Sequence, residues 1–116
     1  MTARRSVRTP VTCLAAALAA VPLALTAACG RPALRSHTVE IRGFAYLPAT
    51  LQVAEGDTVV WINRDAVPHT ATRDGRRWDS GIINAEQRWR LIAASAGSQP
   101  YYCTFHPVMR GELVVR

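Results

Sequence analysis

Residues 101–109, which read YYCTFHPVM, bring three possible metal ligands into one short stretch. Cys103 offers a thiolate, His106 an imidazole and Met109 a thioether. Soft sulfur ligands favour copper, and two histidines with one cysteine and a weak axial methionine are the usual ligands of a blue copper site. The stretch supplies one of these histidines. His69 lies well upstream of Cys103 in the sequence and is the candidate for the other.

Each of these residues has an ordinary structural interpretation when it is taken alone. A single histidine such as His69 is most often a hydrogen-bonded core or loop residue. A lone Cys103 would behave as a small hydrophobic side chain, and a lone Met109 would be a packing residue. Their order and spacing together favour a metal centre. Thiolate and imidazole also suit zinc, so these residues alone leave copper and zinc open.

Residues 1–28 have the pattern of an export signal. Residues 2–9 are polar and carry three arginines, and residues 11–28 are uncharged and rich in alanine and leucine. A basic start and an apolar stretch that ends in small residues are typical of a signal peptide that is removed. The apolar stretch just reaches the lower length limit for a membrane-spanning helix, but its small-residue end favours cleavage.

Cys29 follows the apolar stretch directly, in the sequence LTAAC. This sequence resembles the lipobox of bacterial lipoproteins and predicts that Cys29 is lipidated and becomes the N-terminus. The alternative is an ordinary signal peptide that is cut near Ala28. We expect residues 29–36 to be the lipidated cysteine and a short tether, and residues 37–116 to be the folded domain. Cys103 would then be the single thiol of that domain, with no partner for an internal disulfide.

The charge of the chain gives little support to nucleic-acid binding. Removal of residues 1–28 would take three of the 14 basic residues away, and residues 29–116 would keep 11 arginines and 8 acidic residues, a net charge of +3. The arginines are scattered along the chain, whereas a nucleic-acid interface gathers them on one face. The length supports one domain, and we expect a monomer.

From residue 37 onward, the sequence has the two-residue period of β-strands. Val39 and Ile41 share one face of the first segment, and Thr58–Asn63 is apolar on both faces, as in a central strand. Short strands separated by turn residues indicate an all-β sandwich or barrel. We expect a turn or bulge at residues 44–48 and an interruption at Ser98-Gln99. The expected strands are residues 37–42, 50–54, 58–63, 69–73, 87–93, 100–103 and 112–116.

Two loops resemble the ligand loops of amicyanin and related cupredoxins, the plastocyanin-like type 1 blue copper proteins. Residues 63–70 (NRDAVPHT) resemble the loop of the first ligand, and residues 103–111 (CTFHPVMRG) resemble the second in its short C-x-x-H-x-x-M form. Residues outside these loops match the family pattern as well; they are Phe44, Pro48, Leu51, Val53, residues 56–59 (GDTV) and Trp61. The resemblance covers about residues 39–115 and implies an eight-stranded Greek-key β-sandwich with one copper ion near one end.

The resemblance also implies a role for each candidate ligand. Cys103 would be the strong thiolate ligand, His69 and His106 would complete a trigonal plane, and Met109 would sit on the axis. Asn63 and Thr70 are candidates for groups that brace the loops or contact the thiolate sulfur. By contrast, His37 has no such neighbours in the sequence, and we expect it to be exposed near the tether.

The function that this resemblance implies is one-electron transfer, and the predicted export signal places it outside the cytoplasmic membrane. The ring edge of His106 would reach the surface among Pro68, Pro107 and Val108 and serve as the electron port. The scattered arginines would steer an acidic redox partner. The rival interpretation is an exported copper-binding protein or chaperone that carries no electrons. An enzyme is not expected, because the sequence has no paired acid and base.

Overall fold

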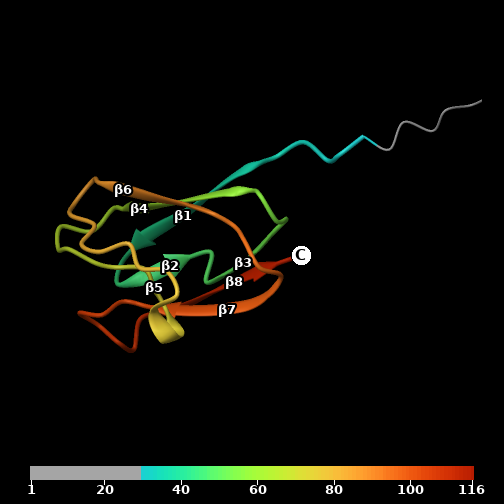
Figure 1. The fold of residues 1–116 in the computed structure, drawn as a ribbon. Helices are drawn as coiled ribbons and strands as arrows, with labels where there is room; N and C mark the ends of the chain where they lie inside the picture. Colours follow the sequence, from blue (N-terminus) through green and yellow to red (C-terminus); the bar gives the residue numbers. More distant parts are fainter. Residues whose placement is uncertain (1–29) are drawn as a thin grey trace, which may run out of the picture. The chain divides into compact units, whose positions relative to one another are not determined.

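The computed structural model describes residues 30–116, so the predicted export signal and Cys29 lie outside the described residues. Residues 31–116 form one compact unit of two four-stranded sheets packed face to face (Figure 1). Within the described part of the chain, no helix is long and apolar enough to cross a membrane. The prediction of an all-β sandwich is therefore confirmed.

The chain passes repeatedly between the two sheets, as expected for a Greek-key sandwich. One sheet has the strand order β2-β1-β4-β6 and the other has the order β3-β8-β7-β5. The β1/β4 and β3/β8 pairs are parallel, and the remaining neighbours are antiparallel. The strands are β1 (Ser36–Arg42), β2 (Ala45–Leu47), β3 (Thr50–Val53), β4 (Thr58–Asn63), β5 (Thr72–Arg73), β6 (Arg88–Ile92), β7 (Gly97–Tyr102) and β8 (Arg110–Val115), and a short 3-10 helix, η1 (Asp74–Arg76), follows β5.

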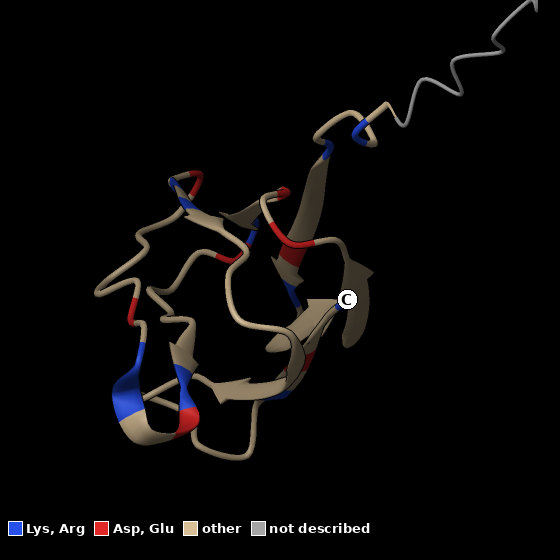
Figure 2. Cartoon of the chain, turned by 45° about the vertical axis from the view of Figure 1, so that its right-hand side comes forward, with Lys and Arg blue, Asp and Glu red and all other residues tan. Residues whose placement is uncertain are grey.

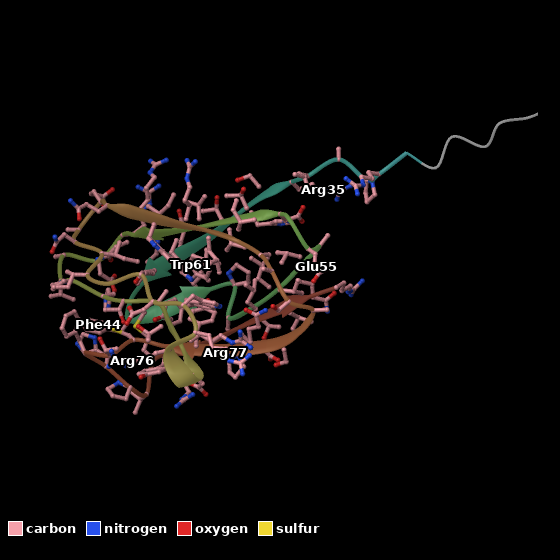
Figure 3. All side chains as sticks on the ribbon, in the orientation of Figure 1. Arg35, Phe44, Glu55, Trp61, Arg76 and Arg77 are labelled. Carbon is pink, nitrogen blue, oxygen red and sulfur yellow. The ribbon has the colours of Figure 1, made fainter. Side chains whose placement is uncertain are left out.

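The core forms where the inward faces of the two sheets meet. Val39 and Ile41 of β1 are fully buried, as their alternation predicts, and Trp61 of β4 lies between the sheets (Figure 3). The ring of Trp61 contacts three other aromatic rings at centroid distances of 5.3–5.6 Å, those of Trp78, Trp89 and Tyr101. Aromatic side chains bury more apolar area than any others, so this group supplies much of the packing in so small a domain.

Two local predictions were wrong. Residues 44–48, expected as a turn or bulge, contain β2, which pairs with β1 after a tight turn at Gly43 and Phe44. Ser98 and Gln99 do not interrupt a strand, because they pair with Val114 and Leu113 of β8 in a β7 that starts at Gly97. In both places, pairing with a neighbouring strand fixes a conformation that the local polar or turn-forming residues do not favour.

A buried carboxylate joins the start of β1 to the turn before β4. Oδ1 of Asp57 accepts a hydrogen bond from the backbone N–H of Arg35 at 2.9 Å, and Oδ2 lies 3.1 Å from the N–H of Ala54 and 2.8 Å from Nε2 of His37. The N–H of Arg35 and the ring of His37 lower the pKa of Asp57 to about 2. The expectation that His37 is simply exposed was wrong, since its half-buried ring belongs to this contact.

Candidate metal centre

Cys103 lies directly after β7 and begins the loop that leads to β8. Its backbone N–H donates to the carbonyl of Met109 at 3.1 Å, and its own carbonyl accepts from the N–H of His106 at 3.2 Å. A third bond of 2.8 Å joins the N–H of Met109 to the carbonyl of His106. These three bonds fold the loop back on itself, so that the three candidate ligands in it are held at fixed backbone positions.

His69 reaches the same place from the other ligand loop, which follows β4. Its backbone exchanges two hydrogen bonds with Ile83, at 3.1 and 2.8 Å. The side chain is fully buried. The strand expected at residues 69–73 is therefore shorter than predicted: it consists of β5 preceded by this isolated bridge.

The structure brings His69, Cys103 and His106 together. Sγ of Cys103 lies 3.8 Å from Nδ1 of His69 and 3.7 Å from Nδ1 of His106, and the three ligand atoms all lie within 4.8 Å of one another. With the bond lengths typical of zinc, a sulfur at about 2.3 Å and a nitrogen at about 2.0–2.1 Å in one trigonal plane would be roughly 3.8 Å apart. The spacing is therefore that of two ligands on a shared ion.

Met109 is placed at the far end of the same loop, immediately before β8. Its side chain is buried, with 4% of its surface exposed, and it belongs to the core cluster that also contains Cys103. A buried thioether in the loop that also carries Cys103 and His106 would add a second soft donor to the set. Such a set fits copper better than zinc, because zinc sites seldom use methionine.

Asp65 is a site residue that the sequence interpretation missed. Its Oδ2 lies 2.9 Å from Nε2 of His69, on the ring edge opposite the one that faces Cys103. A carboxylate there holds the proton on Nε2 and leaves Nδ1 free to bind a metal. Burial alone would raise the pKa of Asp65, but hydrogen bonds from the N–H groups of Phe44 and Gly43, together with His69, lower it. An acidic residue four positions before a ligand histidine was the available signal.

Asn63 and Thr70 both contact the ligand loops, and their contacts differ. The buried amide of Asn63 donates to the carbonyls of Val67 and Ile83, at 2.8 and 2.9 Å, so it braces the loop of His69. The backbone N–H of Thr70 points to Sγ of Cys103 at 3.4 Å. Its hydroxyl accepts a hydrogen bond from the N–H of Thr104 at 2.9 Å, which ties the two ligand loops together.

The surface around His106 is apolar. His106 is half-buried, Pro68 and Pro107 are exposed, and 95% of Val108 is exposed. Phe44, which the sequence interpretation assigned no part in the site, packs edge-on against the rings of both His106 and His69, at centroid distances of 4.9 and 5.3 Å. Phe44 is itself half-exposed at this end of the domain (Figure 3).

A curated relative is similar to this chain over most of the described residues. Amicyanin from Paracoccus denitrificans is 42% identical over 82 residues, a match that covers 66% of this chain and 63% of the relative. The chain thus spans a little under two thirds of the length of that relative. No protein-family model matches the sequence.

Solved structures share the fold. A methionine-to-alanine variant of amicyanin in its Cu(I) form matches with a TM-score of 0.65 and 34% identity, covering 70% of this chain and 82% of that one. A purple cupredoxin from Nitrosopumilus maritimus matches with a TM-score of 0.66 and 26% identity, covering 69% of this chain and 99% of that one.

Proposed function

This chain belongs to the amicyanin-like cupredoxins, and from that membership we propose that it carries single electrons on one type 1 copper ion outside the cytoplasmic membrane. The observation that supports this most strongly is the triangle of Cys103, His69 and His106, with nitrogen–sulfur spacings of 3.7 and 3.8 Å. Copper, when bound, supplies a one-electron couple that no side chain in the domain offers.

We propose His69, Cys103, His106 and Met109 as the ligands. His69 and Cys103 are fully buried, so the protein fixes their positions and excludes water from them. Asp65 would hold the proton of His69 on Nε2, and the N–H of Thr70 would donate to the thiolate. Because these contacts restrain the ligands, the site would change little when its charge changes by one unit, which favours fast electron exchange.

His106 is the proposed electron port. Of the proposed ligands it is the half-buried histidine, and the exposed residues Pro68, Pro107 and Val108 of the two ligand loops would form an apolar surface around it. An apolar patch of this kind excludes water from a brief contact, yet it is too small to hold a partner tightly. The arginines elsewhere on the domain would steer an acidic redox protein towards it.

The proposed location is the periplasm or outer cell surface, with a lipid anchor on Cys29. The support is in the sequence: a basic start, an apolar stretch and the LTAAC segment. Residues 30–35, which precede β1, would link the anchor to the domain.

The second candidate is a copper chaperone or store that carries no electrons. Colour and redox chemistry separate the two. The Cu(II) protein should be intensely coloured and should show a reversible one-electron couple, whereas Cys103→Ser should lose the colour because the thiolate donates the charge-transfer electron. A Cys103→Ser protein that kept the colour would refute the ligand assignment. A coloured wild type with no reversible couple would favour the chaperone.

A further inference from the structure

A pocket opens along the side of the sandwich between the edge strands of the two sheets. β5 is the edge of one sheet and β6 is the edge of the other. The pocket has a volume of about 260 Å³, and the residues that line it include Arg73, Arg77, Trp78, Leu91, Ile92 and Gln99. None of these residues belongs to the metal centre or to the apolar surface around His106.

Two arginines of this pocket have no acidic partner within the described residues. The acidic side chains nearest in sequence are engaged elsewhere: Asp74 pairs with Arg110 at 3.4 Å, and Asp79 pairs with Arg76 at 3.7 Å. Arg73 and Arg77 therefore keep their charge available to a ligand. Figure 2 shows this gathering of basic residues at η1, and Figure 3 labels Arg77 beside it.

One wall of the pocket, formed by Trp78 and Gln99, is firmly held. Trp78 is half-buried, and its Nε1–H donates to Oε1 of the buried Gln99 at 2.9 Å. The amide of Gln99 donates in turn to the carbonyls of Ala94 and Ser95, at 2.8 and 2.7 Å. With its polar groups satisfied, this wall offers a ligand apolar contact. An indole face and a leucine beside two guanidinium groups suit a small organic anion whose body is apolar.

The same tryptophan connects the pocket to the metal centre through packed atoms. Its ring lies 5.5 Å from that of Tyr101, which precedes Cys103 by two positions on β7. A second branch runs from Tyr101 to the ring of Tyr46 at 4.6 Å. The hydroxyl of Tyr46 donates to the carbonyl of Thr70 at 2.5 Å, and the N–H of Thr70 points to Sγ of Cys103. Electronic coupling decays less steeply through such contacts and bonds than through solvent.

We propose that this pocket binds a small redox-active anion with an apolar body and passes one electron from it to the metal centre by a route that does not use His106. The anion is oxidised by one electron and the metal centre is reduced by one. No bond forms or breaks and no proton moves, because the aromatic residues act only as the medium. The proposal rests on the proposed electron-carrier function.

Binding can be tested separately from electron transfer. The Cu(I) protein would be titrated with ferrocenecarboxylate, which is already reduced, while the indole N–H resonances are followed by NMR. We expect saturable shifts of the Trp78 resonance. The cation (ferrocenylmethyl)trimethylammonium, which has the same apolar body, should cause none. Arg73→Gln with Arg77→Gln should weaken the binding of the anion, whereas Arg88→Gln with Arg90→Gln, an equal charge change on the exposed face of β6, should not.

Stopped-flow relaxation to equilibrium of the Cu(II) protein with an excess of ferrocenecarboxylate supplies the second measurement. The Arg73/Arg77 variant should react roughly tenfold more slowly at low salt, and the Arg88/Arg90 control should react within about twofold of the wild type, since a distant charge is largely screened. Equal slowing by the Arg88/Arg90 control, or a Trp78 resonance that does not shift, would overturn the proposal that the anion binds in this pocket. A protein without a reversible couple would overturn the proposed electron-carrier function instead, and the titration would still show whether the anion binds in the pocket.

Discussion

The carboxylate of Asp65 lies 2.9 Å from Nε2 of His69, and the same two oxygens accept the backbone N–H groups of Gly43 and Phe44. One side chain therefore positions both a proposed ligand and the turn that carries the phenyl ring packed against it. The orientation of His69 and the packing of Phe44 are thus coupled through a residue that touches no metal.

Asp65→Ala should weaken metal binding by about 10–100-fold, because His69 loses the group that fixes its protonated nitrogen. Asp65→Asn, which keeps an acceptor oxygen, should lose less of the affinity for metal. Competition titration with a chelator of known affinity measures both variants. Asp74→Ala, which removes an exposed acid, serves as the control. An Asp65→Ala protein with the affinity of the wild type would show that the ring of His69 is held by its packing alone.

Met109→Leu should retain copper and raise the reduction potential. The buried thioether is a weak donor that stabilises the oxidised ion more than the reduced one, and leucine fills a similar volume without that donor. Voltammetry measures the potential, and metal analysis confirms occupancy. A lower potential in a fully loaded variant would contradict the axial role of Met109.

Val108→Asp should slow electron exchange with an acidic redox protein by about tenfold at low salt, because it places a negative charge on the proposed docking patch. The colour and the potential should hardly change, since Val108 is 95% exposed and not a proposed ligand. Stopped-flow kinetics tests this. Leu34→Asp makes the same chemical change at another exposed site and should leave the rate near that of the wild type. If both variants slowed equally, net charge and not docking at His106 would be responsible.

The stability of the domain should fall as the pH is lowered from about 4 towards 2. The pKa of Asp57 is about 2 in the folded protein, against about 3.9 in an unfolded chain. The contribution of Asp57 to stability is therefore complete above its pKa in the unfolded chain, and it is lost as the pH falls through its pKa in the folded protein. Denaturant unfolding of the wild type and of Asp57→Asn would reveal this as a stability difference that shrinks below pH 4. A difference that stays constant down to pH 2 would contradict it.

Cys29→Ala should move the exported protein from the detergent phase to the aqueous phase in a phase-partition experiment. Two acyl chains anchor a protein stably, whereas a single chain binds marginally. Mass spectrometry of the N-terminus provides the direct measurement. A free, unmodified N-terminus at or near Cys29 would exclude the lipid anchor and leave an ordinary signal peptide.

The sequence was most informative where local pattern and long-range structure agree. Local pattern alone indicated three features. The alternation of Val39 and Ile41 indicated a buried strand face, the apolar run of β4 indicated a central strand, and the spacing of residues 103–109 indicated a metal centre. Asp65 had only the weak local signal of its position four residues before His69, and its contact with Phe44 could not be found in this way, because that contact joins separate turns of the chain. Gln99 was predicted to interrupt a strand for a similar reason. Its partner strand β8 and the indole of Trp78 that hydrogen-bonds its side chain lie elsewhere in the chain.

The parallel pairing of β3 with β8 has a consequence for how the domain folds. Its register joins Thr50 to Glu112, which lie near opposite ends of the folded domain's sequence, and β8 also completes the partner surface of β7. Pairing residues so far apart in sequence costs the entropy of closing a large loop before any pairing energy is gained. Such topologies therefore fold slowly. Until β8 pairs, β3 has no partner strand and β7 is paired only with β5, so the loop that begins with Cys103 has no second support. Docking of β8 is therefore the step that completes the burial of Cys103, and metal bound before that step would shield the thiol from oxidation while the domain folds.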